Sequence, residues 1–140
     1  MGKINMARVL LGGLVAGIVV NLFEYVTNGV VLASEWEAAM SSLGHAMPDS
    51  AIAGFVASGF VLGIGAIWFY AAARPRFGPG PGTAVITGAS YWLFAYALPN
   101  FGLGVLSLFP TRLLVISTLV GLIELVAASL CGAALYKEQA

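Results

Sequence analysis

Long apolar runs alternate with short polar stretches along this chain. A membrane-spanning helix needs about 20 mostly apolar residues to cross a hydrocarbon core roughly 30 Å thick. Four runs approach that length, and we predict helices at about residues 7–32, 51–73, 83–98 and 113–136. Pro99 leaves two outcomes for the third run: the helix kinks and continues, or it ends and residues 101–109 lie at the interface. The pattern predicts an all-α integral membrane four-helix bundle, a single domain over residues 1–140.

The composition also indicates a membrane protein. Apolar residues form 60% of the 140-residue chain and charged residues only 9%, whereas a soluble domain has about 25% charged residues. Six basic and six acidic side chains give zero net charge, so no broad basic surface is available for nucleic acid. The single cysteine, Cys131, excludes an internal disulfide and a cysteine-based metal cluster within one chain, and we expect no cofactor.

The basic residues are distributed unevenly between the predicted loops. Arg112 is alone on one side, and the other side has Lys3, Arg8, Arg74, Arg76 and Lys137. Because short cytoplasmic loops are rich in lysine and arginine, both termini and the loop at residues 74–82 are predicted to be cytoplasmic. Arg74 and Arg76 would then contact anionic lipid headgroups, and the alternating glycine and proline residues would force a tight turn.

The opposite side begins with residues 34–50, which contain acidic but no basic side chains. Ser34 and Glu37 match a capping box, and Gly44 suits a helix stop. We predict a short amphipathic helix lying on the outer surface; an ordinary ordered loop is the alternative. Trp36 and Tyr96 are expected in the aromatic belt at the outer boundary.

Two carboxyl groups, Glu24 and Glu124, lie within the predicted spans. A carboxylate in hydrocarbon costs about 2.5 kcal/mol or more, so it is rarely found there without a partner or a wet cavity. Spacings of three and four residues place each glutamate on a helix face of small and polar residues. The first face consists of Gly13, Gly17, Asn21, Glu24 and Asn28, and the second of Ser117, Gly121, Glu124 and Ala128.

We expect these two faces to point at each other, with Asn21 the nearest in depth to Glu124. Tyr91 lies deep in the third span, and a buried tyrosine hydroxyl needs a partner, which either glutamate could supply. Gly12 is further round the first helix, so it should tolerate a larger side chain better than Gly17. The polar face either only joins helices, through bonds of about 0.6 kcal/mol each, or forms a site that binds a cation or relays protons.

Two classes of function fit these features. The first is a proton-linked transporter or permeation protein for a small cationic or amphipathic solute, with a ligand or proton site formed by Asn21, Glu24, Asn28, Tyr91 and Glu124. The second is a non-catalytic accessory subunit or lipid-binding module, whose polar face is structural or meets a partner. The sequence has no nucleophile–base pair and no metal-ligand spacing, so an enzyme is not expected. Four helices enclose little volume, which favours a homo-oligomer or a larger membrane complex.

Three stretches of the chain carry a family resemblance: AGIVVNLFEYVTNGVVL, WFYAAARPRFGPGPGTA and GLIELVAASLCGAALYKE. Together they resemble an uncharacterised family of small bacterial four-helix inner-membrane proteins. The residues that give the stretches their character are Glu24, Asn28, Arg74, Pro75, Gly78 and Glu124. The resemblance implies the fold and a bacterial inner-membrane location, and it implies no activity. A looser similarity, to small multidrug-resistance transporters, is limited to the helix number and a first-span glutamate.

Cysteine accessibility tests the predicted orientation. In a Cys131→Ser background, a reagent added from outside should label Ser41→Cys and miss Gly80→Cys, because the two positions fall in loops on opposite sides. The reverse labelling pattern would contradict the orientation.

Overall fold

The long apolar runs form long helices, in which each backbone donor and acceptor can be paired within one segment. The computed structural model describes residues 3–139; it is 81% helical, and no strand occurs within this range. Three helices are long and apolar enough to cross a membrane, and they are Met6–Val31, Ala51–Phe77 and Thr111–Ala133. The chain is therefore all-helical, as predicted, with three candidate membrane spans.

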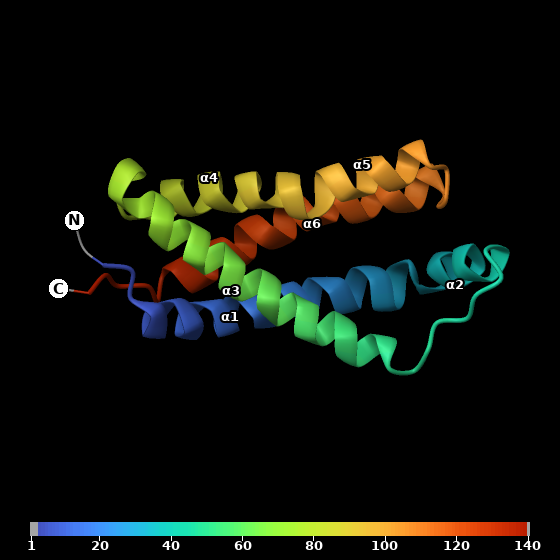
Figure 1. Ribbon diagram of the computed structural model, residues 1–140, viewed down its shortest axis with the longest axis horizontal. Helices are drawn as coiled ribbons and strands as arrows, with labels where there is room; N and C mark the ends of the chain where they lie inside the picture. The colour runs from blue at the N-terminus through green and yellow to red at the C-terminus, as the bar shows by residue number, and fades with distance from the viewer. Residues whose placement is uncertain (1–2, 140) are drawn as a thin grey trace.

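The elements follow one another with few breaks (Figure 1). The first part of the chain consists of α1 (Met6–Glu24), the π-helical segment η1 (Tyr25–Val31), the short helix α2 (Ala33–Ser42) and the long helix α3 (Ala51–Phe77). The second part consists of α4 (Pro81–Trp92), the π-helical segment η2 (Leu93–Ala97), α5 (Leu98–Val105) and α6 (Thr111–Ala133).

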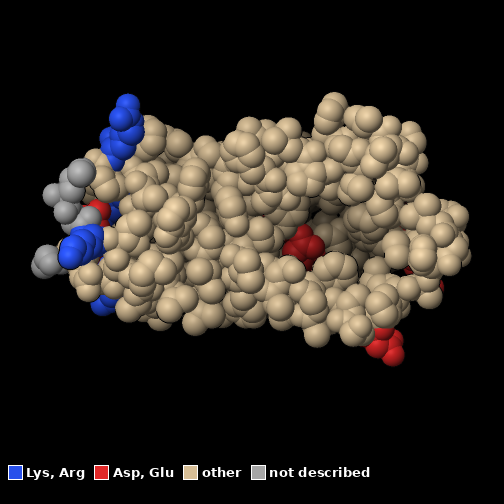
Figure 2. Space-filling view, in the orientation of Figure 1, with Lys and Arg blue, Asp and Glu red and all other residues tan. Residues whose placement is uncertain are grey.

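The long helices lie side by side. The most extensive contact joins α1 to α3, and α6 packs against both α1 and α4. Both termini lie at the end where α3 turns into α4, and α2 lies at the opposite end (Figure 1). Figure 2 shows basic side chains gathered at the terminal end, followed by a long surface that is almost free of charge.

Glycines set the distance between α1 and its neighbours. A Cβ atom on Gly63 of α3 would lie only 2.3 Å from the backbone nitrogen of Gly17. The expectation for Gly12 is wrong, because a Cβ there would lie 2.6 Å from the carbonyl oxygen of Gly132. α1 packs on two helices, so Gly17 faces α3 while Gly12, further round, faces α6.

Two helices extend beyond their predicted ends. α3 continues to Phe77 and contains Pro75 in its last turn, where the proline has no N–H to donate to the Ala71 carbonyl. It ends at Gly78, whose φ of 83° suits glycine, so the predicted turn is present but shorter. The third run does not stop at Pro99: it is helical over residues 81–105, and Pro99 lies in the first turn of α5, directly after η2.

The surface helix predicted after the first span is present as α2, but its predicted capping box is wrong. The cap position is Leu32, and no side chain caps the helix. The chain runs into α2 from η1, so the Trp36 N–H is already satisfied by the Leu32 carbonyl (3.0 Å). The predicted stop is confirmed: Gly44 has a φ of 74°, and its N–H donates to the Ser41 carbonyl at 2.9 Å.

A pair of alanine substitutions in α3 tests the glycine contact. Gly63→Ala should destabilise the protein by about 1–3 kcal/mol, because the added methyl group forces α1 and α3 apart. Gly54→Ala is the matched control, since nothing lies within 4 Å of a Cβ there and alanine favours a helix by about 0.5–1 kcal/mol over glycine. Thermal unfolding in detergent should separate the two variants, and equal unfolding temperatures would contradict the close contact.

Candidate protonatable site

Glu24 and Glu124 are joined by one tyrosine. The hydroxyl of Tyr96, in η2, lies 2.9 Å from Oε1 of Glu24 and 2.7 Å from Oε1 of Glu124. Glu124 comes from the middle of α6 and is only 1% exposed, whereas Glu24 is the last residue of α1 and is half-buried. Three separate helical stretches therefore meet at a single hydroxyl group.

Local structure brings Tyr96 to this position. Gly121 lies one turn before Glu124 on α6, and a Cβ there would come within 2.9 Å of the Tyr96 ring. Glycine thus leaves room for the ring to lie flat against α6. The π-helical turn of η2 contributes as well, because π-helices pair residues five apart and so change which side chains face α6 beyond Trp92.

The tyrosine predicted for this role is a different one. Tyr91 does not meet the carboxyl groups among the described contacts; a Cβ on Gly65 of α3 would lie 2.5 Å from its hydroxyl. The sequence predicts Tyr96 in the aromatic belt at the outer boundary, and it leaves open whether the third helix kinks or ends at Pro99. Since the helix continues to Val105, Tyr96 lies further inside the apolar stretch.

Asn28 extends the site toward α2. Its amide nitrogen donates to Oε2 of Glu24 at 2.7 Å, and its amide oxygen accepts from the indole nitrogen of Trp36 at 2.9 Å. Asn28 stands four residues after Glu24, so the predicted helix face brings these two side chains together. Trp36, expected only as an aromatic belt residue, thereby becomes part of the polar network.

Asn21 has a different place from the predicted one. Its amide nitrogen donates to the carbonyl groups of Gly17 (2.9 Å) and Val56 (3.2 Å), and the side chain packs against Gly59. The contacts with Val56 and Gly59 join α1 to α3, and none of the described hydrogen bonds of Asn21 reaches Glu24 or Glu124. Asn21 is therefore a helix–helix contact below the carboxyl pair.

A cavity of about 220 Å³ adjoins the pair. Its walls come from α1, α3 and η2, and they consist of Glu24, Phe55, Ser58, Gly59, Leu62, Ala95 and Tyr96. Figure 2 shows an acidic group at the bottom of a hollow in the uncharged lateral surface. The cavity thus exposes one carboxyl group to a mostly apolar space, while Glu124 stays behind Tyr96.

Further polar contacts hold the helical stretch of Tyr96 against α6. The Asn100 amide donates to the hydroxyl of Thr118 at 2.7 Å, and the indole nitrogen of Trp92 donates to the Thr118 carbonyl at 2.7 Å. They flank η2 on both sides, so they fix the position of the Tyr96 hydroxyl. No spacing in the sequence pairs these residues, because the partners stand on different helices.

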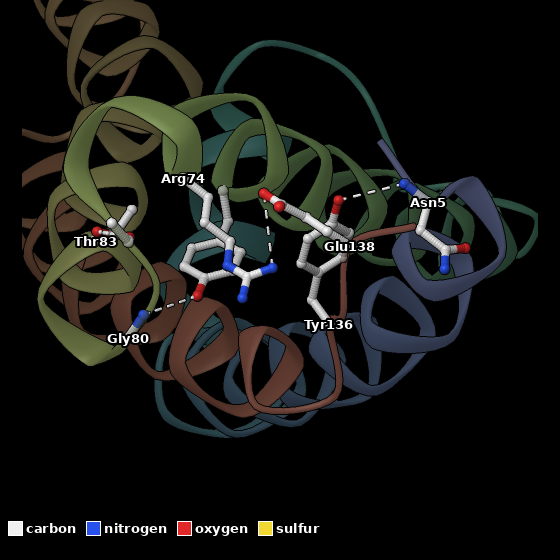
Figure 3. A network of polar contacts seen from close by, with 8 residues as sticks. Asn5, Arg74, Gly80, Thr83, Tyr136 and Glu138 are labelled. Carbon is white, nitrogen blue, oxygen red and sulfur yellow. Dashed lines mark hydrogen bonds and ion pairs between the residues drawn. The ribbon is translucent and has the colours of Figure 1, made fainter. Parts of the chain in front are cut away.

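The two arginines predicted at lipid headgroups differ in their surroundings. The guanidinium group of Arg74 lies 5.6 Å from the ring centre of Tyr136 and 3.7 Å from the carboxylate of Glu138 (Figure 3). Arg74 therefore fastens the C-terminal segment to α3. Arg76 is exposed at the same end of the molecule and remains available to headgroups.

Similarity to known proteins adds nothing to this geometry. No protein-family model, curated protein or solved structure matches the chain. The resemblance to small bacterial inner-membrane proteins therefore stays a prediction. Within residues 3–139, no group of three or more histidine, cysteine, aspartate or glutamate side chains could hold a metal ion.

Removing a single hydroxyl group tests the bridge. Tyr96→Phe keeps the ring on Gly121 but leaves Glu24 and Glu124 without their shared partner, which should cost about 1–3 kcal/mol of unfolding free energy. Tyr91→Phe is the matched control on the same helical stretch and should be nearly silent. Unfolding in detergent measures both variants, and a larger effect at Tyr91 would contradict the assignment.

Proposed function

We propose that this chain is a four-span protein of the bacterial inner membrane with both termini in the cytoplasm. The helical stretch over residues 81–105 supplies the remaining span, since 25 residues at about 1.5 Å each exceed a core roughly 30 Å thick. The gathering of basic side chains at the terminal end supports the orientation (Figure 2). The bacterial membrane is inferred from the family resemblance.

The function that the site supports best is proton-linked transport of a small cationic or amphipathic solute. The observation that carries this proposal is the Tyr96 hydroxyl between two carboxyl groups, beside a cavity that Glu24 lines. Ionisable groups inside a membrane protein commonly mark ion or proton pathways. A carboxyl pair that serves only to join helices needs no such cavity.

The hydrogen bonds suggest how a proton and a solute would be linked. A hydroxyl group has one proton to donate, so Tyr96 can satisfy only one of its two carboxyl contacts as donor. The other contact is stable if a carboxyl group donates to the tyrosine oxygen. The two carboxyl groups of Glu24 and Glu124 would therefore share one proton. A cation bound in the cavity would replace the positive charge of that proton.

The cavity limits the size and chemistry of the solute. A cavity of about 150 Å³ can hold benzene, so about 220 Å³ suits one ring or a short alkyl chain bearing an ammonium group. Phe55 and Leu62 offer apolar contact to the body of such a solute. Its charge would lie at Glu24, since none of the described residues lining the cavity is basic.

A non-catalytic accessory subunit or lipid-binding module is the second candidate. Between 22% and 39% of the 18-residue apolar window of each candidate span is buried inside one copy of the chain. The rest is apolar surface for lipids, for a second copy or for a larger membrane complex. In this case the carboxyl pair would be a structural contact.

Conservative substitution separates the two candidates. The protein is reconstituted in liposomes containing a pH-sensitive dye, and proton movement is recorded when benzylammonium is added. Glu24→Gln and Glu124→Gln should each abolish coupled proton movement while leaving the fold intact, because an amide keeps the size and still donates and accepts hydrogen bonds but cannot ionise. Glu37→Gln, an exposed position on α2, is the matched control and should behave as wild type.

Two outcomes would reject transport. One is wild-type proton movement in both glutamine variants at every pH tested. The other is a wild-type protein that moves no protons against any small amine of this size. Either result would favour the accessory or lipid-binding module.

A further inference from the structure

Trp36 terminates a hydrogen-bonded chain that leads from the surface helix α2 to the carboxyl pair. The chain runs from the Trp36 indole to Asn28 (2.9 Å), from Asn28 to Glu24 (2.7 Å), and from Glu24 through Tyr96 to Glu124. Its links all lie between 2.7 and 2.9 Å, and its residues come from α2, η1, α1, η2 and α6. It therefore connects an outer surface element with the most deeply buried acid.

Trp36, at one end of this hydrogen-bonded chain, fixes which groups donate and which accept along it. An indole N–H can only donate, so the Asn28 amide must turn its oxygen to Trp36 and its nitrogen to Glu24. Oε2 of Glu24 consequently accepts a hydrogen bond from the Asn28 amide. Tyr96 then donates to Oε1 of Glu24 and accepts from Glu124.

We infer that Trp36 is a positioning residue that, through Asn28, holds the negative charge of the pair on Glu24 and the shared proton on Glu124. This inference rests on the proposed function, because Glu24 is the carboxyl group that lines the cavity for the solute. A solute cation would thus meet the charged member of the pair, and the proton to be released would sit on the member behind Tyr96.

The surroundings of both carboxyl groups agree with this assignment. Asn28 and Tyr96 form hydrogen bonds with Glu24, and Ser58 of α3, whose hydroxyl donates to the Gly54 carbonyl, lines the same cavity. Glu124 is almost fully buried, and among the described residues its hydrogen-bond partner is Tyr96. A charge is less costly at Glu24, beside the cavity and with two donors, than at Glu124.

The position of α2 is itself held from another part of the chain. The Trp36 ring lies edge-on to Phe109, with ring centres 5.4 Å apart, and Glu35 pairs with Arg112 at the start of α6. A displacement of α2 from this connection would withdraw the indole and free the Asn28 amide to turn. The charge of the carboxyl group at the solute site therefore depends on the position of the surface helix α2.

Infrared spectroscopy tests where the proton sits without any transported solute. The wild-type protein at neutral pH should show the C=O band of one protonated carboxyl group. Glu24→Gln should keep this band, because Glu124 carries the proton, and Glu124→Gln should lose it. The opposite result, band lost in Glu24→Gln and kept in Glu124→Gln, would overturn the assignment.

The role of Trp36 is tested in the Glu124→Gln background, where Glu24 is the remaining acid of the pair. Asn28→Leu, which removes the donor, should make the protonated band reappear, and Trp36→Phe, which frees the amide, should do so in part. Trp68→Phe is the matched control, because Trp68 is an exposed residue of α3 that belongs neither to this hydrogen-bonded chain nor to the lining of the cavity. Equal spectra for Trp36→Phe and Trp68→Phe would reject the positioning role.

Binding of benzylammonium in detergent provides a second measurement. With Glu124 intact, Trp36→Phe should weaken binding roughly tenfold while Trp68→Phe leaves it unchanged, since only the first loses a link to the charged group. Unaltered binding in Trp36→Phe would count against the inference. Because the infrared measurement needs no solute, a protein that transports nothing but shows the expected bands would reject the proposed function and leave the charge assignment standing.

Discussion

Two carboxyl groups lie inside an apolar helical protein, and each needs hydrogen-bond partners because burying an unpaired polar group is costly. The Tyr96 hydroxyl meets this need for both Glu24 and Glu124. The requirement constrains three helical stretches at once, since α1, η2 and α6 must come within reach of one oxygen atom. The cavity, the contacts around η2 and the link to α2 all depend on that meeting point.

The two halves of the molecule surround the carboxyl pair with different kinds of contact. Toward the termini, glycines bring α1 against α3 and α6 at backbone distance, and the packing there is close and apolar. Toward α2, polar side chains take over, with Asn28 and Trp36 on one side and Asn100 and Thr118 on the other. The carboxyl pair lies where these regions meet, with close apolar packing on one side and hydrogen-bonding side chains on the other.

Both π-helical segments border the carboxyl pair. η1 starts directly after Glu24, and η2 contains Tyr96. A π turn changes the register of a helix and is frequently found at functional sites. In η2 the π turn changes the register of the residues that follow Trp92, Tyr96 among them, and in η1 it changes the register of the residues that follow Glu24, Asn28 among them.

Sequence alone determined the features that depend on local geometry. Helices follow from apolar runs, and the faces that carry Glu24 with Asn28 and Glu124 with Gly121 follow from the helical period, since residues three and four apart share a side. The end of α2 at Gly44 is equally local, because the left-handed backbone conformation there depends on that one glycine.

Tertiary structure decided which polar groups meet. Tyr96 replaced Tyr91 because the helix continues through Pro99 and changes register in η2, and Asn21 turned to α3 because Gly59 lies opposite it. Gly12 proved as closely packed as Gly17 because α1 has two neighbours. Such choices depend on the distance and rotation between helices, which are set by packing over the whole chain and leave no period or spacing in the sequence.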